Sequence, residues 1–198
     1  MINITERRGR LLDVADELQK ELFEERIRML EKEYKKEENR RTVIQAFDKL
    51  ASSWMEVHGN SDDRKKAANL GINFLFSSIL TNTYEFKLSL LGEEFLFEEA
   101  PVEIMWRPHY FFEYFEEDMV FIIKKLKDSF PRLCRAEEDA VRLKCADYYL
   151  AAVCKLCRDM AEEIAGSNEF RKIDKTDDFF LFFGKFHGEG EKLWSISG

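Results

Sequence analysis

The sequence predicts an α+β fold, mainly a helical bundle with a long N-terminal helix, completed by a small antiparallel sheet. The chain has only three prolines and nine glycines in 198 residues, so we expect long, uninterrupted elements. Hydrophobic residues make up 45% and aromatic residues 14% of the chain, which is enough apolar material for a packed core. Alternating segments near 84–106 and 178–197 are typical of β-hairpins. The length suits a single domain, 1–198.

The long helix is expected over residues 5–38, in a segment 1–40 that either extends from the body or wraps around it. Strong helix formers dominate this segment, which contains no proline. Its apolar positions form two sets that lie about 120° apart around the helix axis, farther than a coiled-coil seam would drift. Either the helix wraps its own domain, or one half contacts another chain and forms an oligomer. The first set is Leu11, Ala15, Leu18 and Leu22, and the second is Phe23, Ile27, Leu30 and Tyr34.

Four more helices are expected after the first. The stretch HGNSDD at 58–63 reads as a turn, in which Ser61 or Asp62 can cap the next helix. Pro108 suits the first turn of a helix, Pro131 separates that helix from the next, and Gly166 closes the last one. The four helices are expected at about 41–57, 62–80, 108–127 and 134–165.

The sheet is expected to come from two hairpins. In the first, apolar residues alternate with Lys87 and Ser89, a turn follows at 92–94, and residues 95–97 return. A third strand is expected at 102–106. The second hairpin turns around Gly188 and Gly190, and the two hairpins can join in one antiparallel sheet.

The charge of the chain is concentrated in one segment. Residues 85–118 contain ten acids and two bases, which accounts for the whole net charge of −8, whereas both flanking segments are balanced. Such a single-sign field favours association with a basic protein partner. The alternative is an ordinary solvated surface with aromatics inward and acids outward. Trp106 is then either a core residue or an exposed anchor. The candidate partner-binding residues are Glu94, Glu98, Glu99, Glu103, Trp106, Glu113, Glu116 and Glu117.

Four cysteines within 24 residues, Cys134, Cys145, Cys154 and Cys157, end in a CxxC pair that invites a zinc or redox interpretation. On one helix, however, Cys145 and Cys154 would lie about 180° apart and could not share a metal ion. We therefore expect reduced, mostly buried thiols and no metal or cofactor.

A second metal-like row consists of His109, Glu113 and Glu117, which share a helix face at intervals of four residues. A solvated helix face explains this row more simply. The segment 64–80 resembles a helix-turn-helix only in its small and apolar residues, because aromatic side chains occupy the positions that would read bases. We do not expect a nucleic-acid partner.

These patterns predict a non-catalytic, intracellular protein-binding or adaptor protein. It would act as an inhibitor, an immunity-type protein or a subunit of a complex, and would present an acidic, aromatic-rich face. One alternative is a metal-dependent enzyme or metalloprotein that uses Glu113, Glu117 and His109, or the cluster from Cys134 to Cys157. Another is a DNA-binding regulator that uses residues 64–80. Without an apolar signal core or membrane span, we expect a cytoplasmic protein with no membrane partner.

Overall fold

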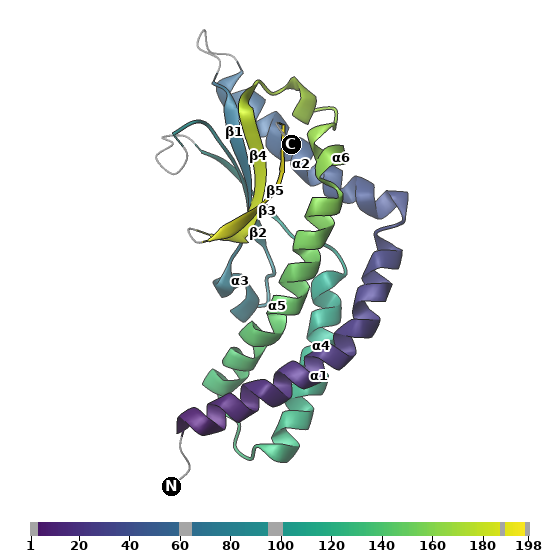
Figure 1. Cartoon of the computed structure of the whole chain (residues 1–198), viewed down its shortest axis with the longest axis vertical. Coiled ribbons are helices and arrows are strands. Elements are labelled where there is room, and N and C mark those ends of the chain that lie inside the picture. Colours follow the sequence, from purple (N-terminus) through teal and green to yellow (C-terminus); the bar gives the residue numbers. More distant parts are fainter. Residues whose placement is uncertain (1–3, 60–64, 95–100, 187–188, 197–198) are drawn as a thin grey trace. The chain divides into compact units, whose positions relative to one another are not determined.

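The computed structural model describes residues 4–59, 65–94, 101–186 and 189–196, and it confirms a mainly helical α+β fold (Figure 1). Helices are interspersed along the chain with the strands of one five-stranded sheet, so the two kinds of element do not form separate blocks. The elements are α1 (Ile4–Glu33), α2 (Glu37–His58), β1 (Ala67–Phe74), α3 (Phe76–Leu80), β2 (Phe86–Leu91), β3 (Val102–Trp106), α4 (Phe111–Ser129), α5 (Arg135–Asp159), α6 (Ala161–Ala165), the 3-10 helix η2 (Phe170–Lys172), β4 (Lys175–Lys185) and β5 (Gly190–Ser195).

The chain divides into two compact units, which we describe separately. The helical unit contains α1, α3, α4 and most of α5, and the sheet unit contains α2, the five strands, α6 and η2. The division between them falls inside α5, after Val153. The single domain expected from the chain length stays a prediction. The helical unit comprises Met1–Lys35, Phe76–Tyr84 and Pro108–Val153, and the sheet unit comprises Lys36–Leu75, Glu85–Arg107 and Cys154–Gly198.

In the helical unit, α1 packs antiparallel to α4. Near the start of α1, Arg7 Nε lies 2.8 Å from the carboxylate of Glu137, and Arg7 also donates to the carbonyl of Pro131, beyond the end of α4. Just after α1 ends, the Tyr34 hydroxyl donates to the carbonyl of His109, before the start of α4, at 2.8 Å. Leu11 is buried near one end of α1 and Tyr34 lies just past the other, also buried. Both ends of α1 therefore contact its own unit. Whether the helix wraps the body or extends from it stays a prediction, as does an oligomer through α1.

The helix expected at 62–80 is wrong, because residues 67–74 form the central strand β1. This strand pairs antiparallel with β2 and parallel with β4, so the sheet is mixed and has the order β3-β2-β1-β4-β5. Both faces of β1 are covered, so the polar residues Asn69 and Asn73, which alternate with Leu70 and Ile72, are buried as well. The short helix α3 is all that is helical between residues 65 and 80. The expected caps Ser61 and Asp62 lie outside the described residues.

Both predicted regions form a hairpin. In the first, the partner of β2 is β3, the strand expected at 102–106, and Phe86 lies opposite Trp106. In the second, β4 pairs with β5 so that Leu181 lies opposite Trp194. The expectation that they join in a purely antiparallel sheet is wrong, because β1 lies between them and runs parallel to β4. The return strand expected at 95–97 and the turn residue Gly188 lie outside the described residues.

The core of the sheet unit lies between the sheet and α2, which are drawn beside each other in Figure 1. Phe47 and Trp54 on α2 are buried. The ring of Phe47 lies 5.7 Å from that of Trp106 on β3, and the Trp106 ring lies 5.8 Å from that of Phe86 on β2. Large aromatic side chains of this kind contribute much of the free energy that stabilises a small core.

The remaining helices begin and end within a few residues of the expected positions. The helix expected from Pro108 begins at Phe111, because the residue before it, Tyr110, has a φ of 68° and cannot belong to the helix. The helix expected over 134–165 is divided into α5 and α6 at Met160. Among the described helices, none is long and apolar enough to cross a membrane.

Replacing Gly71 by alanine should lower the free energy of unfolding by about 1–3 kcal/mol, because an added methyl group overpacks the sheet. A Cβ atom at this position in β1 would lie 2.7 Å from the Phe182 ring and 2.8 Å from the Asn73 amide nitrogen. The matched control is Gly9→Ala on α1, where a Cβ meets nothing within 4 Å. This control should raise the free energy of unfolding by about 0.5–1 kcal/mol through helix propensity. Urea unfolding measures both, and equal effects of the two changes would contradict the close packing at Gly71.

Candidate functional site

The acidic segment 85–118 is shared between the two units. Residues 85–107 belong to the sheet unit and residues 108–118 belong to the helical unit. Two predicted partner-binding residues, Glu98 and Glu99, lie outside the described residues. The six described ones are Glu94, Glu103 and Trp106 in the sheet unit, and Glu113, Glu116 and Glu117 in the helical unit.

In the sheet unit, the predicted residues have three different environments. Glu94 is exposed after the end of β2. Glu103 on β3 pairs with Lys87 on β2 at 2.8 Å and accepts a hydrogen bond from Ser89 at 3.3 Å. Trp106 is only 7% exposed and packs in the core, so it is not an exposed anchor. Part of the negative charge in this unit is therefore neutralised across the β2–β3 hairpin.

In the helical unit, Glu116 on α4 is paired with a base from another helix. Two nitrogens of the Arg142 guanidinium on α5 lie 2.6 and 3.2 Å from the two Glu116 carboxylate oxygens. The Tyr84 hydroxyl also donates to Glu116. Paired guanidinium-carboxylate bonds of this kind are among the stronger polar interactions in proteins. Glu116 is therefore committed to contacts within its own unit.

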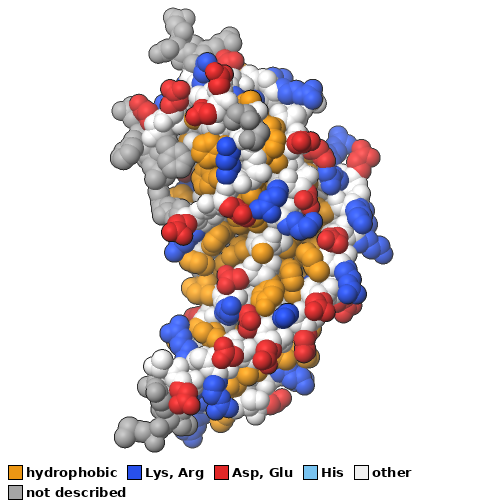
Figure 2. Space-filling view, in the orientation of Figure 1, with side chains coloured by type: hydrophobic (Ala, Val, Ile, Leu, Met, Phe, Trp, Pro, Cys, Tyr) orange, Lys and Arg blue, Asp and Glu red, His pale blue; other side chains and the backbone are white. Residues whose placement is uncertain are grey.

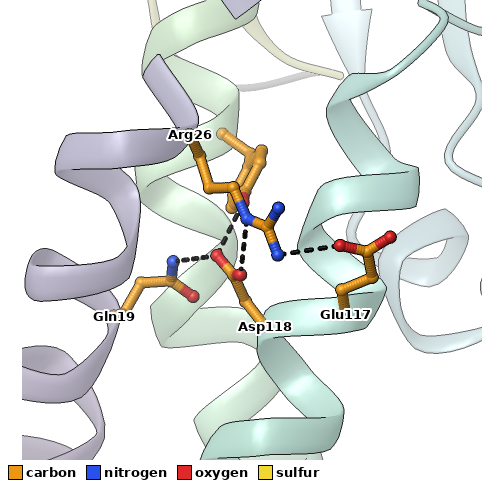
Figure 3. A network of polar contacts seen from close by, with 5 residues as sticks. Gln19, Arg26, Glu117 and Asp118 are labelled. Carbon is orange, nitrogen blue, oxygen red and sulfur yellow. Dashed lines mark hydrogen bonds and ion pairs between the residues drawn. The ribbon is translucent and has the colours of Figure 1, made fainter. Parts of the chain in front are cut away.

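The last acids of the segment join a polar network between α1, α4 and α5 (Figure 3). The Asp118 side chain is fully buried and accepts hydrogen bonds from Gln19 Nε2 at 2.9 Å, Arg26 Nε at 3.0 Å and the Tyr149 hydroxyl at 2.7 Å. The same Arg26 donates to Glu117 at 2.8 Å, although the Glu117 side chain is 62% exposed. Burying a carboxylate costs much free energy unless its oxygens are paired with a positive charge and hydrogen-bonded, as they are here.

The network favours the protonated forms of both Tyr149 and Arg26. Burial raises the pKa of the Tyr149 hydroxyl, and the hydrogen bond to Asp118 raises it further, so this tyrosine stays a proton donor. Burial alone lowers the pKa of Arg26, but the hydrogen bond and the negative charge of Asp118 outweigh burial and raise it overall. Both shifts favour a charged arginine and a neutral tyrosine around one carboxylate.

The count of ten acids against two bases therefore does not translate into one acidic surface. Arg26 and Arg142 come from outside the segment and pair with three of its acids. Figure 2 shows acidic and basic side chains interspersed over the visible face.

One exposed stripe does combine acids with apolar side chains, and we name it the α4 stripe. It consists of Tyr110, Glu113, Glu117, Val120 and Phe121. At about 100° per residue the four positions on α4 lie within about 100° of one another, opposite the buried side of the helix, and Tyr110 directly precedes it. Val120 is 71%, Phe121 42% and Tyr110 37% exposed. Sequence reasoning identified Glu113 and Glu117 but missed Val120 and Phe121, although a helical projection of 111–129 would have separated them from the core positions.

The four cysteines are free thiols with different exposures. Cys134 is exposed, whereas Cys145, Cys154 and Cys157 are buried. Burial raises the pKa of Cys145 to about 12 and, together with a hydrogen bond to Glu191, raises that of Cys154 to about 12. Burial also raises the pKa of Cys157. Protonated thiols are poor nucleophiles and poor metal ligands.

Metal binding gains no support from the described residues. Within residues 4–59, 65–94, 101–186 and 189–196, no group of three or more His, Cys, Asp and Glu side chains could hold a metal ion. This statement covers the row formed by His109, Glu113 and Glu117 as well as the cysteines.

Comparison of the chain with protein-family models, with curated proteins and with solved structures gave no match. The proposals below therefore rest on the side chains of this chain.

Replacing Asp118 by alanine should lower the free energy of unfolding by about 3–5 kcal/mol, because it removes the acceptor that Arg26, Gln19 and Tyr149 share. The matched control is the neighbouring acid on the same arginine: Glu117→Ala should cost less than about 1 kcal/mol, since this partner is exposed. Urea unfolding at neutral pH, followed by circular dichroism, measures both. Similar costs for the two variants would show that the buried carboxylate has no special role.

A thiol reagent should modify one cysteine in the native protein and four after denaturation. Cys134 is the exposed thiol, and the raised pKa values of the buried ones suppress their thiolate forms. Counting released chromophore from an aromatic disulfide reagent measures this number, and Cys134→Ser should abolish the native reaction. Fast reaction of any thiol in that variant would contradict the burial of Cys145, Cys154 and Cys157.

Proposed function

We propose that this chain is a non-catalytic protein-binding protein, an adaptor, inhibitor, immunity-type protein or complex subunit, whose α4 stripe binds a basic surface of a protein partner. The observation that carries the proposal is the exposure of Val120 and Phe121, 71% and 42%, on the same helix face as Glu113 and Glu117. Exposed apolar side chains bordered by charged ones are characteristic of protein-binding surfaces.

The apolar part of the stripe would supply most of the affinity. Val120 and Phe121 are adjacent on α4. The Lys125 ammonium lies over the Phe121 ring, 5.7 Å from its centroid, yet Phe121 is still 42% exposed. A partner that covers these side chains removes apolar surface from water, at roughly 25 cal/mol per Å². Aromatic side chains at the centre of an interface often dominate its free energy of binding.

The acidic part of the stripe would select the partner. Glu113 and Glu117 lie toward the N-terminal end of α4, and Lys124 and Lys125 lie toward its C-terminal end. A partner that presents basic groups toward the first end and an apolar pocket over Val120 fits this arrangement. Exposed charges of this kind act mainly on the rate of association, which depends on salt.

No comparable observation supports the two alternative functions, DNA binding and metal binding. A DNA-reading helix in 64–80 is not available, because residues 67–74 form the buried strand β1. A metalloprotein would need a cluster of ligands that the described residues do not form. The cytoplasmic location expected from the sequence remains part of this proposal, as does the basic character of the partner.

A photo-crosslinking amino acid in place of Val120 should capture one specific protein in cells of the native host. The matched control is the same amino acid in place of Val57, which is 54% exposed on α2 in the sheet unit. Mass spectrometry of the crosslinked products identifies the partner. Identical products from both positions, or none from position 120, would reject the α4 stripe as the binding surface.

With the partner in hand, two kinds of variant should act differently. Glu113→Lys together with Glu117→Lys should slow association about tenfold at low salt and flatten its salt dependence. Phe121→Ala should leave the association rate nearly unchanged and speed dissociation, because it removes buried contact area. Surface plasmon resonance over a series of salt concentrations measures both rates. Unchanged rates in both variants would reject the proposal.

A further inference from the structure

A groove of about 670 Å³ lies in the sheet unit, between α2 and the segment that runs from α6 to η2. One wall is a single face of α2, because Arg41, Ile44, Gln45 and Asp48 are spaced by three or four residues. The opposite wall is formed by residues between 162 and 171. The volume is in the range of small-molecule sites, about 300–1,000 Å³.

Polar contacts hold both walls of the groove in place, and two of its carboxylates, Asp48 and Glu163, take part in them. The Asp48 carboxylate accepts hydrogen bonds from the Ser167 hydroxyl at 2.5 Å and from the backbone N–H of Glu169 at 3.2 Å. Glu163 pairs with Arg40, whose Nε lies 3.3 Å from one of its carboxylate oxygens. The groove is therefore preformed, and Glu163 is neutralised by Arg40, whereas Asp48 is hydrogen-bonded only to uncharged donors and keeps its negative charge.

Two guanidinium groups in the groove have no such partner. Arg41 and Arg171 both line it, and neither side chain makes a hydrogen bond or ion pair with the described part of the chain. Glu162 is the one lining carboxylate without a side-chain hydrogen bond or ion pair to the described part of the chain, and its charge and that of Asp48 balance the two arginines. The groove therefore offers open guanidinium N–H donors rather than a net positive charge. The Arg171 guanidinium also lies over Gly166, where an added Cβ would be 3.5 Å from Nη2.

We propose that this groove binds a small molecule through a doubly charged oxyanion group, a phosphate or a dicarboxylate, held by Arg41 and Arg171. Guanidinium groups present planar pairs of N–H donors that match phosphate and carboxylate oxygens. Gln45 and Asn168 add amide groups that can bind uncharged polar parts of the ligand, and Ile44 provides an apolar surface. The site belongs to the sheet unit and does not depend on the function proposed for the α4 stripe.

Isothermal titration calorimetry of the full chain tests the proposal, with pyrophosphate, inorganic phosphate and succinate as separate probes at constant ionic strength. We expect saturable binding of at least one probe. Arg41→Gln and Arg171→Gln should each raise its Kd at least about tenfold, because each removes a charge-assisted contact. Both arginines are exposed, so the variants should fold as the parent chain does. The matched control is Arg28→Gln on α1, another exposed arginine without a partner among the described residues.

The probes also separate the two chemical sources of the anion. Binding of phosphate or pyrophosphate alone indicates a phosphate ester as the natural ligand, and binding of succinate alone indicates a dicarboxylate. An absence of saturable binding for all three probes would overturn the proposal. Equal weakening by Arg28→Gln would overturn it as well, because the binding would then reflect the overall charge rather than the groove.

Discussion

The packing of the helical unit depends on one buried carboxylate. Asp118 lies on α4, yet its three hydrogen-bond donors come from α1 and α5, so a single side chain ties the three helices together. A buried charge tolerates little displacement of its partners, because each lost hydrogen bond leaves a polar group desolvated. This constraint sets which side of α4 faces inward. It consequently leaves Glu117 and Val120, on the other side, available to solvent.

Local patterns were sufficient to predict most of the fold. The helices show apolar residues at intervals of three and four, and β2 shows apolar positions alternating with Lys87 and Ser89. Strand β1 was missed although Leu70, Ile72 and Phe74 alternate with Asn69, Gly71 and Asn73, because the alternation covers only six residues and the segment was interpreted as a helix. The parallel pairing of β1 with the distant β4 is not visible in one sequence.

Less of the candidate site than of the fold could be predicted from the sequence. Counting charges correctly found the acid-rich segment, but Arg26 is separated by 92 residues from the acid it neutralises. No local pattern relates two residues so far apart in the sequence. Counting charges therefore overestimated how much negative charge lies on the surface. Exposure of Val120 and Phe121, in contrast, follows from the periodicity of α4 alone. The groove between α2 and α6 depends on tertiary packing and had no counterpart in the sequence.

The parallel pairing of β1 with β4 has a consequence for the order in which the chain can fold. During synthesis β1 emerges together with β2 and β3, but β4 begins only at Lys175, about a hundred residues after β1. Until then the β1 edge of the growing sheet has unpaired backbone groups, and such edges pair readily with other chains. Contacts between distant segments also slow folding. The centre of the sheet is thus completed only after β4 has been synthesised, and until then its open edge favours pairing with other chains.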